Sequence, residues 1–169
     1  TRTDSPIMHF FSMQSARYSQ KKDTWRDKDG KSVELAVHYL PAHEHNVQLM
    51  LDAMKLSLDL FSEKFSPFQF HQARILEFPA YESFAQSFAN TVPYSESIGF
   101  IQDYDDKKSD ETIDFVSYVT AHEIGHQWWA HQVIGADKQG ATMLCETFAQ
   151  YSALHVMEAM HGKEQIRKF

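Results

Sequence analysis

Two histidines four residues apart, with a glutamate directly after the first, stand in the stretch TAHEIGHQWW at residues 120–129. On a helix, residues four apart lie on one face, so the imidazoles of His122 and His126 can bind one metal ion. Glu123 is rotated by about 100° from His122, so its carboxylate is suited to take a proton from water at the ion. The pattern predicts metal-assisted hydrolysis. Because the chain holds ten histidines, the alternative is that both are ordinary packing or surface residues.

A catalytic zinc ion needs a third protein ligand, and three residues are candidates. His131 does not fit the longer zinc motif with a third histidine, since that histidine would stand at position 132, which is Gln132. Glu146 stands on the next predicted helix, with nineteen residues between it and the second motif histidine. Cys145 is adjacent and thiolate binds zinc well, but one helical residue turns a side chain by about 100°, so only one of the two can face the metal. We favour Glu146 and keep Cys145 as the alternative.

The pair VTAHEIGHQWW and LCETFAQY resembles the zinc aminopeptidases of the aminopeptidase N type. These gluzincins carry H-E-x-x-H, eighteen residues and then a glutamate, whereas this chain has nineteen. We place the extra residue in the loop GADKQG, although strict counting would select Cys145. The resemblance spans about residues 31–161 and implies an α+β, thermolysin-like zincin catalytic subdomain. It also implies one zinc ion held by His122, His126 and Glu146, with Glu123 as general base, and peptide substrates with a free N-terminus.

The family also carries a GAMEN strand, whose glutamate holds the free amino group of the substrate, and this chain lacks that motif as written. At about the corresponding distance stands PYSESIGF, with 25 residues between Glu96 and His122. A carboxylate at the start of a short edge strand facing the zinc could pair with a peptide's ammonium group while the strand pairs with the peptide backbone. We therefore expect Glu96 to bind substrate; the alternative is an ordinary loop acid.

The family's catalytic tyrosine, which steadies the oxyanion, lies several tens of residues beyond the third ligand, whereas this chain ends 23 residues after Glu146. Tyr151 is instead expected to pack or to orient a ligand. HEIGHQWWAHQVIGA and PYSESIGF look most like peptidase domains of large bacterial membrane proteins of this family. We therefore expect 1–169 to be one partial domain, truncated at its C-terminus and poorly active alone, whose parent supplies further domains and, if membrane-bound, the membrane segments.

A small sheet and several helices are expected to position these residues. Residues 1–40 are predicted to be a β-rich entry segment, with strict alternation in SVELAVHYL at 32–40, and 41–169 to be the zincin catalytic subdomain. A long amphipathic helix is predicted at 43–65, because its apolar residues recur at spacings of four and three. The remaining predicted elements are strands at 68–79 and 98–104 and helices at 111–132 and 141–161. A small mixed sheet would then pack against the zinc helix pair and the long helix.

Composition excludes several other classes. The net charge of −7, with acids and bases interleaved, leaves no basic stripe for nucleic acid. The single cysteine cannot form an internal disulfide, and no apolar run reaches the roughly eighteen residues of a membrane span. The acidic stretch 103–111 lacks the glycine and distal glutamate of a calcium-binding EF-hand and is predicted to lead into a helix, capped by Ser109 or Asp110. Localisation stays open.

Two other functions use the same zinc residues. One is a module that binds peptide around zinc without cleaving it, and the other is a zinc endopeptidase. An intact Glu123 favours chemistry over binding, because a binding module has no need of a base.

Overall fold

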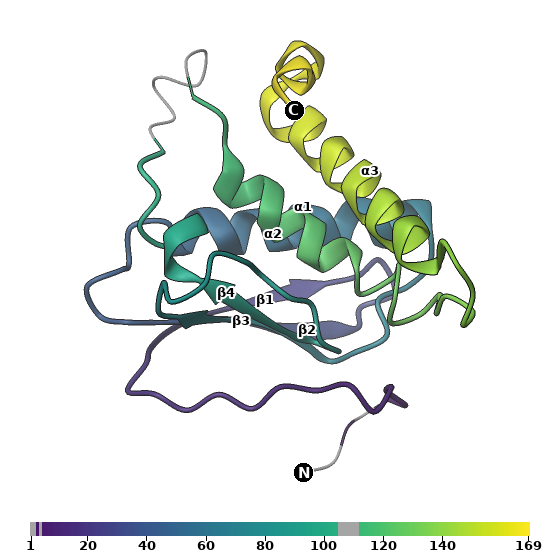
Figure 1. The fold of residues 1–169 in the computed structure, drawn as a ribbon, viewed down its shortest axis with the longest axis horizontal. Coiled ribbons are helices and arrows are strands. Elements are labelled where there is room, and N and C mark those ends of the chain that lie inside the picture. The colour runs from purple at the N-terminus through teal and green to yellow at the C-terminus, as the bar shows by residue number, and fades with distance from the viewer. Residues whose placement is uncertain (1–2, 4, 105–111) are drawn as a thin grey trace.

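The computed structural model describes residue 3, residues 5–104 and residues 112–169, which form a four-stranded sheet with α-helices on one side (Figure 1). The strands are β1 (Ser19–Arg26), β2 (Ser32–Tyr39), β3 (Gln72–Phe78) and β4 (Thr91–Ser95). The helices are α1 (Val47–Lys64), α2 (Phe115–Gly125) and α3 (Ala141–His161). Two 3₁₀ turns, η1 (Glu96–Ile98) and η3 (Lys163–Lys168), complete the order of elements.

The sheet is mixed, with strand order β1-β2-β3-β4. β1 and β2 form an antiparallel hairpin whose turn contains Gly30 at φ +85°, a left-handed conformation that glycine adopts without strain. β2, β3 and β4 run parallel to one another, so their carboxyl ends meet at one edge of the sheet. Together with the helices, this sheet confirms the predicted α+β class.

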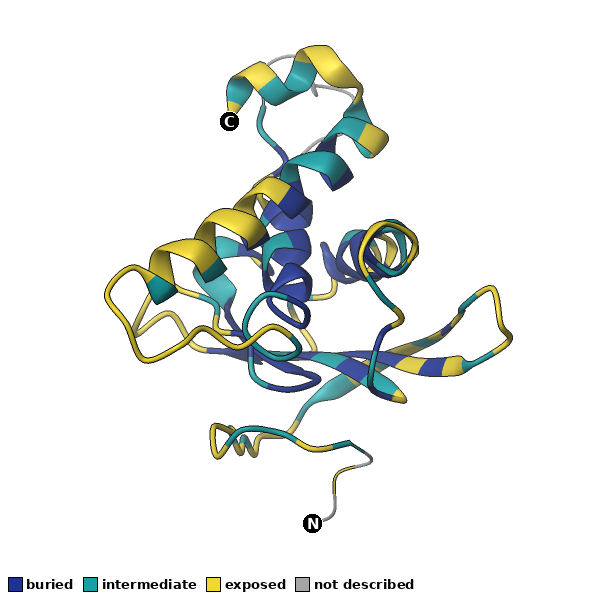
Figure 2. Ribbon diagram, turned by 90° about the vertical axis from the view of Figure 1, so that its right-hand side faces the viewer, coloured by how far each residue is buried: buried dark blue, intermediate teal, exposed yellow. Residues whose placement is uncertain are grey.

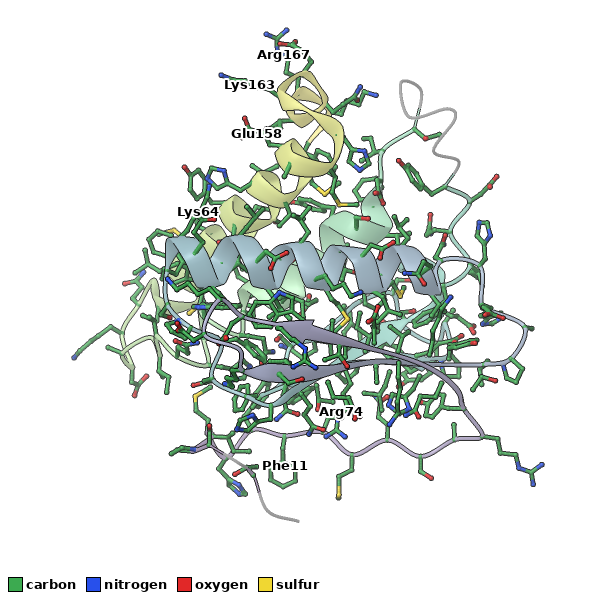
Figure 3. All side chains as sticks on the ribbon, turned by 180° about the vertical axis from the view of Figure 1, so that it is seen from behind. Phe11, Lys64, Arg74, Glu158, Lys163 and Arg167 are labelled. Carbon is green, nitrogen blue, oxygen red and sulfur yellow. The ribbon has the colours of Figure 1, made fainter. Side chains whose placement is uncertain are left out.

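The core lies between the sheet and α1. The alternation in β2 is confirmed, because Val33, Leu35, Val37 and Tyr39 are all buried. The predicted stripe of α1 is buried as well, except for its last member, Phe65, which lies at the C-cap and is partly exposed. On the other face of the sheet lies the segment that precedes β1 and carries the labelled Phe11. It passes near the labelled Arg74 of β3 (Figure 3).

α2 is packed between α1 and α3. Most of its residues are buried, including the polar Ser117, Thr120 and Glu123. Asp114 caps the helix, since its Oδ1 accepts a hydrogen bond from the backbone N–H of Ser117 at 2.9 Å. A helix held in this way on two sides provides a rigid base for side chains at its end.

α3 is buried unevenly along its length. Its buried residues are Ala149, Ser152, Ala153, Val156 and Met157. The first two turns carry exposed Met143, Leu144 and Phe148, and the exposed colour runs along the outer side of the helix (Figure 2). The part of α3 that precedes residue 149 is therefore held by fewer core contacts than the part that follows.

The structure departs from the predicted elements at three places. No strand forms in residues 5–18, and the predicted strand 98–104 is wrong, since η1 and turns lie at its start. β4 lies in a stretch for which the sequence predicted no element, because a proline such as Pro93 is unusual within a strand. Proline offers no N–H, but its carbonyl accepts a hydrogen bond from Gln86 N at 3.1 Å.

Helix boundaries shift by a few residues. α1 begins at Val47 rather than 43, and α2 ends at Gly125 rather than 132. The predicted caps Ser109 and Asp110, with most of the acidic stretch, lie outside the described residues. Within the described part of the chain, no helix is both long and apolar enough to cross a bilayer.

Candidate metal centre

The last turn of α2 brings the two motif histidines together. His126 is the C-cap residue, and its backbone N–H donates to the carbonyl of His122 at 3.1 Å. Their side chains therefore project from successive turns, and their Nε2 atoms lie 3.0 Å apart. The i, i+4 spacing thus places both imidazoles on one face of the helix, as expected.

Glu146 reaches both histidines from α3. Its Oε2 lies 3.2 Å from His122 Nε2 and 3.3 Å from His126 Nε2. The helices can approach closely because Gly125 has no side chain: a Cβ there would lie 3.3 Å from Ala149 Cα. Ala149 lies one turn after Glu146, so this contact fixes the carboxylate against the histidines. We call His122, His126 and Glu146 the helix triad.

The donor set of the helix triad fits a zinc ion. In a tetrahedral site with metal–ligand bonds of about 2.0–2.2 Å, donor atoms lie roughly 3.3–3.6 Å apart, close to the 3.0–3.3 Å found here. Nδ1 of His126 lies 3.0 Å from the carbonyl oxygen of Trp129, which can only accept, so Nδ1 carries the proton and Nε2 keeps its lone pair. Burial, helped by the neighbouring His126, lowers the pKa of His122 and favours its neutral form, which is the form that binds metal.

Glu123 is buried beside the helix triad. Its Oε2 has no hydrogen-bond partner among the described residues. Burial raises the pKa of Glu123 to about 8, and the negative charge of Glu146 acts in the same direction. A divalent cation at the helix triad would lower that pKa. A carboxyl group of this kind can accept a proton and return it near neutral pH.

An outer segment, residues 84–88, pairs with β4 and lies against the end of α2. We call it the edge segment; its bridges to β4 are antiparallel. Ser87 Oγ donates to the backbone carbonyl of Glu123 at 2.9 Å. His131 Nε2 donates to the carbonyl of Ser87 at 3.1 Å, so this third histidine supports the edge segment rather than joining the helix triad.

Gln127, to which none of the motifs described above assigns a role, also fixes this region. Its Nε2 donates to Ser87 Oγ at 2.6 Å and to the carbonyl of Phe88 at 2.9 Å, while its Oε1 accepts from Asn90 N at 2.8 Å. The side chain is almost fully buried. The sequence signal for this role was a polar glutamine between the H-E-x-x-H motif and two tryptophans. A buried amide needs several hydrogen-bond partners, so such a residue is expected to join segments of the chain.

A cavity of about 280 Å³ opens beside the helix triad. Its lining includes His126 and Glu146, Gln86 and Ser87 of the edge segment, and Met8 and Phe10 of the N-terminal segment. Cys145 also lines the cavity, but Glu146 rather than Cys145 shares the close grouping of donor atoms with the histidines.

Tyr151 is exposed on α3, and its ring packs against His155 with centroids 4.7 Å apart.

Glu96 does not join the helix triad. The start of β4 adjoins the end of α2, because Asn90 bonds to Gln127. β4 then runs toward the other end of α2, where Tyr94 OH lies 3.4 Å from the carbonyl of Val116. At about 3.3 Å per residue, Glu96 is carried roughly 15–20 Å along the strand from Asn90.

This placement argues against the expectation that Glu96 binds the amino group of the substrate. In a substrate cut at its first peptide bond, the free amine lies within about 4 Å of the reacting carbonyl. A carboxylate at the far end of β4 cannot reach it. The number of residues between Glu96 and His122 does not give their distance in space, because the chain folds back in a hairpin between the edge segment and β4.

A family model described as the peptidase family M1 domain matches residues 49–169. The chain belongs to peptidase family M1. This membership confirms the resemblance seen in the two zinc-motif helices. No curated protein sequence gives a significant match to this M1 chain.

Among solved structures, the M1 chain resembles the crystal structure of Legionella pneumophila aminopeptidase A in complex with aspartic acid. The match has a TM-score of 0.74 and 16% identity, and it covers 90% of this chain and 18% of that chain. The likeness at this identity shows a shared fold, and the chain spans only a small part of the larger enzyme.

Proposed function

We propose that the chain is the zinc-binding part of a peptidase that cleaves peptide bonds with an activated water. The helix triad would hold one zinc ion, and Glu123 would act as general base. The observation that carries the proposal is the convergence of His122, His126 and Glu146 from two helices, with distances of 3.0–3.3 Å between their donor atoms. Membership of a peptidase family supports it.

The residues of the chain divide the work. When bound, zinc acts as a Lewis acid that makes water more acidic and polarises a peptide carbonyl. Glu123 takes the proton of the attacking water and passes it to the leaving amine. Its burial keeps the carboxyl group away from bulk solvent, so the proton stays at the site. The edge segment and the walls of the cavity would hold the peptide beside these groups.

Removal of N-terminal residues is the leading activity, supported by the fold shared with an aminopeptidase. The remaining domains of a longer protein would then supply the amine-binding group and the oxyanion donor, and any membrane segments. The position of Glu96 favours a second candidate, a zinc endopeptidase, because the expected amine anchor lies at the wrong end of β4. Aminoacyl-anilides and the same substrates with a blocked amino group distinguish the two activities.

The test is Glu123→Gln in the full-length protein. The amide keeps the shape of the side chain but cannot accept the proton, so turnover should fall by at least about 10²-fold while one zinc ion stays bound. Zinc content is measured by mass spectrometry and turnover with aminoacyl-anilides. Glu63→Gln, an exposed glutamate of α1, is the matched control and should leave both unchanged.

Either of two results would reject the assignment. Near-normal turnover would remove Glu123 from the chemistry, and loss of zinc in this variant would make it a ligand or a support for the ligands. A purified protein without zinc would reject the metal site itself.

A further inference from the structure

A second group of metal-ligating side chains gathers at the carboxyl ends of the parallel strands. His43 follows β2, Glu77 lies near the end of β3, and Glu96 directly follows β4. Donor atoms of all three lie within 4.8 Å of one another. We call these residues the strand-end cluster. It lies outside the helix triad, and none of its members has a part in the chemistry proposed above.

Backbone groups orient both carboxylates of the strand-end cluster. Leu40 N donates to Glu77 Oε2 at 2.6 Å, and Ala80 N donates to Glu96 Oε1 at 2.9 Å. Each carboxylate thus has one oxygen fixed by the backbone and one oxygen facing the imidazole of His43. Fixed outer partners of this kind hold ligands in place at metal sites.

The two inward oxygens face the same nitrogen. His43 Nδ1 contacts Glu77 Oε1 closely and lies 3.6 Å from Glu96 Oε2. One nitrogen carries at most one proton, so it can donate to only one of the two carboxylates at a time. A cation placed between the three atoms would satisfy both carboxylates and the imidazole together.

Burial makes this arrangement of two carboxylates energetically unfavourable without a cation. The side chain of Glu77 is fully buried, while His43 is 24% and Glu96 19% exposed. Two carboxylates held this close repel each other, and the interior offers little solvent to screen them. The partial exposure of His43 and Glu96 leaves a path by which an ion can enter.

We propose that the strand-end cluster binds a second divalent transition-metal ion through His43 Nδ1, Glu77 Oε1 and Glu96 Oε2. One imidazole and two carboxylates suit zinc, and water would complete the coordination. The 3.6 Å between His43 and Glu96 falls at the upper end of the roughly 3.3–3.6 Å between ligands of a tetrahedral ion, and the contact between His43 and Glu77 would open to that length. The ion would join the loop before α1 to the ends of β3 and β4.

The test is zinc stoichiometry of the purified chain, measured by isothermal titration with zinc chloride. The wild-type chain should bind two ions. Glu96→Gln keeps an oxygen to accept the bond from Ala80. This variant should bind one ion as before, and its affinity for the second ion should fall by at least about tenfold. His122→Ala/His126→Ala should also bind one ion, and its combination with Glu96→Gln should bind none.

The matched control is Glu82→Gln, an exposed glutamate of the loop between β3 and β4, which should still bind two ions. The proposal would be overturned by a wild-type chain that binds one ion and keeps it after Glu96→Gln, or by a Glu96→Gln chain that still binds two ions. If circular dichroism shows that the histidine double variant does not fold, the comparison of wild type with Glu96→Gln decides alone. Failure of the helix triad to bind zinc would appear separately, as one ion in the wild type that Glu96→Gln removes.

Discussion

Gly125 sets the distance between the helices that carry the helix triad, so enlarging it should remove the third ligand. Its own Cβ, if present, would lie 3.3 Å from Ala149 Cα and 3.4 Å from the carbonyl oxygen of Ala149. Gly125→Ala therefore needs the helices to separate by only a few tenths of an ångström. Gly125→Val adds methyl groups about 1.5 Å further out, toward backbone that cannot move aside locally.

The expected separation follows from van der Waals contact. Carbon atoms pack at about 3.5–4.0 Å, so the added methyl groups push α3 away by roughly 1–1.5 Å. Glu146 Oε2 now lies 3.2 and 3.3 Å from the two histidine nitrogens, and ligand distances at zinc tolerate only about 0.2 Å. Gly125→Val should therefore weaken zinc binding at the helix triad by at least about 10²-fold, or roughly 2.7 kcal/mol.

The assay is competition for zinc against a chromophoric chelator, with circular dichroism to confirm that the variant is folded. Glu96→Gln is present in every protein compared, so that only the helix triad is titrated. Gly125→Ala is the control and should bind zinc within about threefold of the parent protein, since its single added carbon asks for a much smaller shift. A folded Gly125→Val chain with the parent's zinc affinity would refute the reasoning that this contact positions Glu146.

Two further predictions concern stability. Asp114→Ala removes the cap of α2 and the contact of Asp114 Oδ2 with His161 Nε2, and it should cost about 1–2 kcal/mol, a fall in melting temperature of roughly 2–8 °C by calorimetry; an unchanged melting temperature would show that neither contact stabilises the fold. Burial lowers the pKa of His131 below its ordinary value of 6.5, so its contribution to stability is complete above pH 6.5 and is lost as the pH falls from there toward its folded-state pKa. In urea unfolding at pH 7.5 and 5.5, His131→Gln should therefore lose less stability on acidification than wild type, whereas exposed His45→Gln should match wild type; equal losses in all three would contradict this role.

Local patterns predicted the elements whose side chains repeat regularly. The alternation of β2 and the stripe of α1 each expose one apolar face, and both faces are buried as expected. β4 was missed because Pro93 and its polar neighbours hide the alternation, although all five of its residues are buried. The apolar residues at 98–101 suggested a strand, but Phe100 lies in a turn and is buried there. A turn can bury one side chain without the regular alternation of a strand.

The same division applies to the candidate site. His122 and His126 lie four residues apart on one helix, so their sequence spacing determines their spatial spacing. The choice between Cys145 and Glu146 depends on how α3 packs against Gly125, which no local pattern contains. The position of Glu96 depends on the hairpin before β4, so its distance from the histidines cannot be read from the number of residues between them.

The uneven burial of α3 has a consequence for the order in which a metal would be captured. The two histidines stand on a helix enclosed by neighbours, whereas Glu146 precedes the first buried residue of α3. Backbone amides in the first turns of α3 should exchange with deuterated solvent much faster than those of α2 when no ion is present. Binding would then proceed in two steps, rapid capture by the histidine pair followed by closure of the helix end, and the second step would slow amide exchange around residues 143–148.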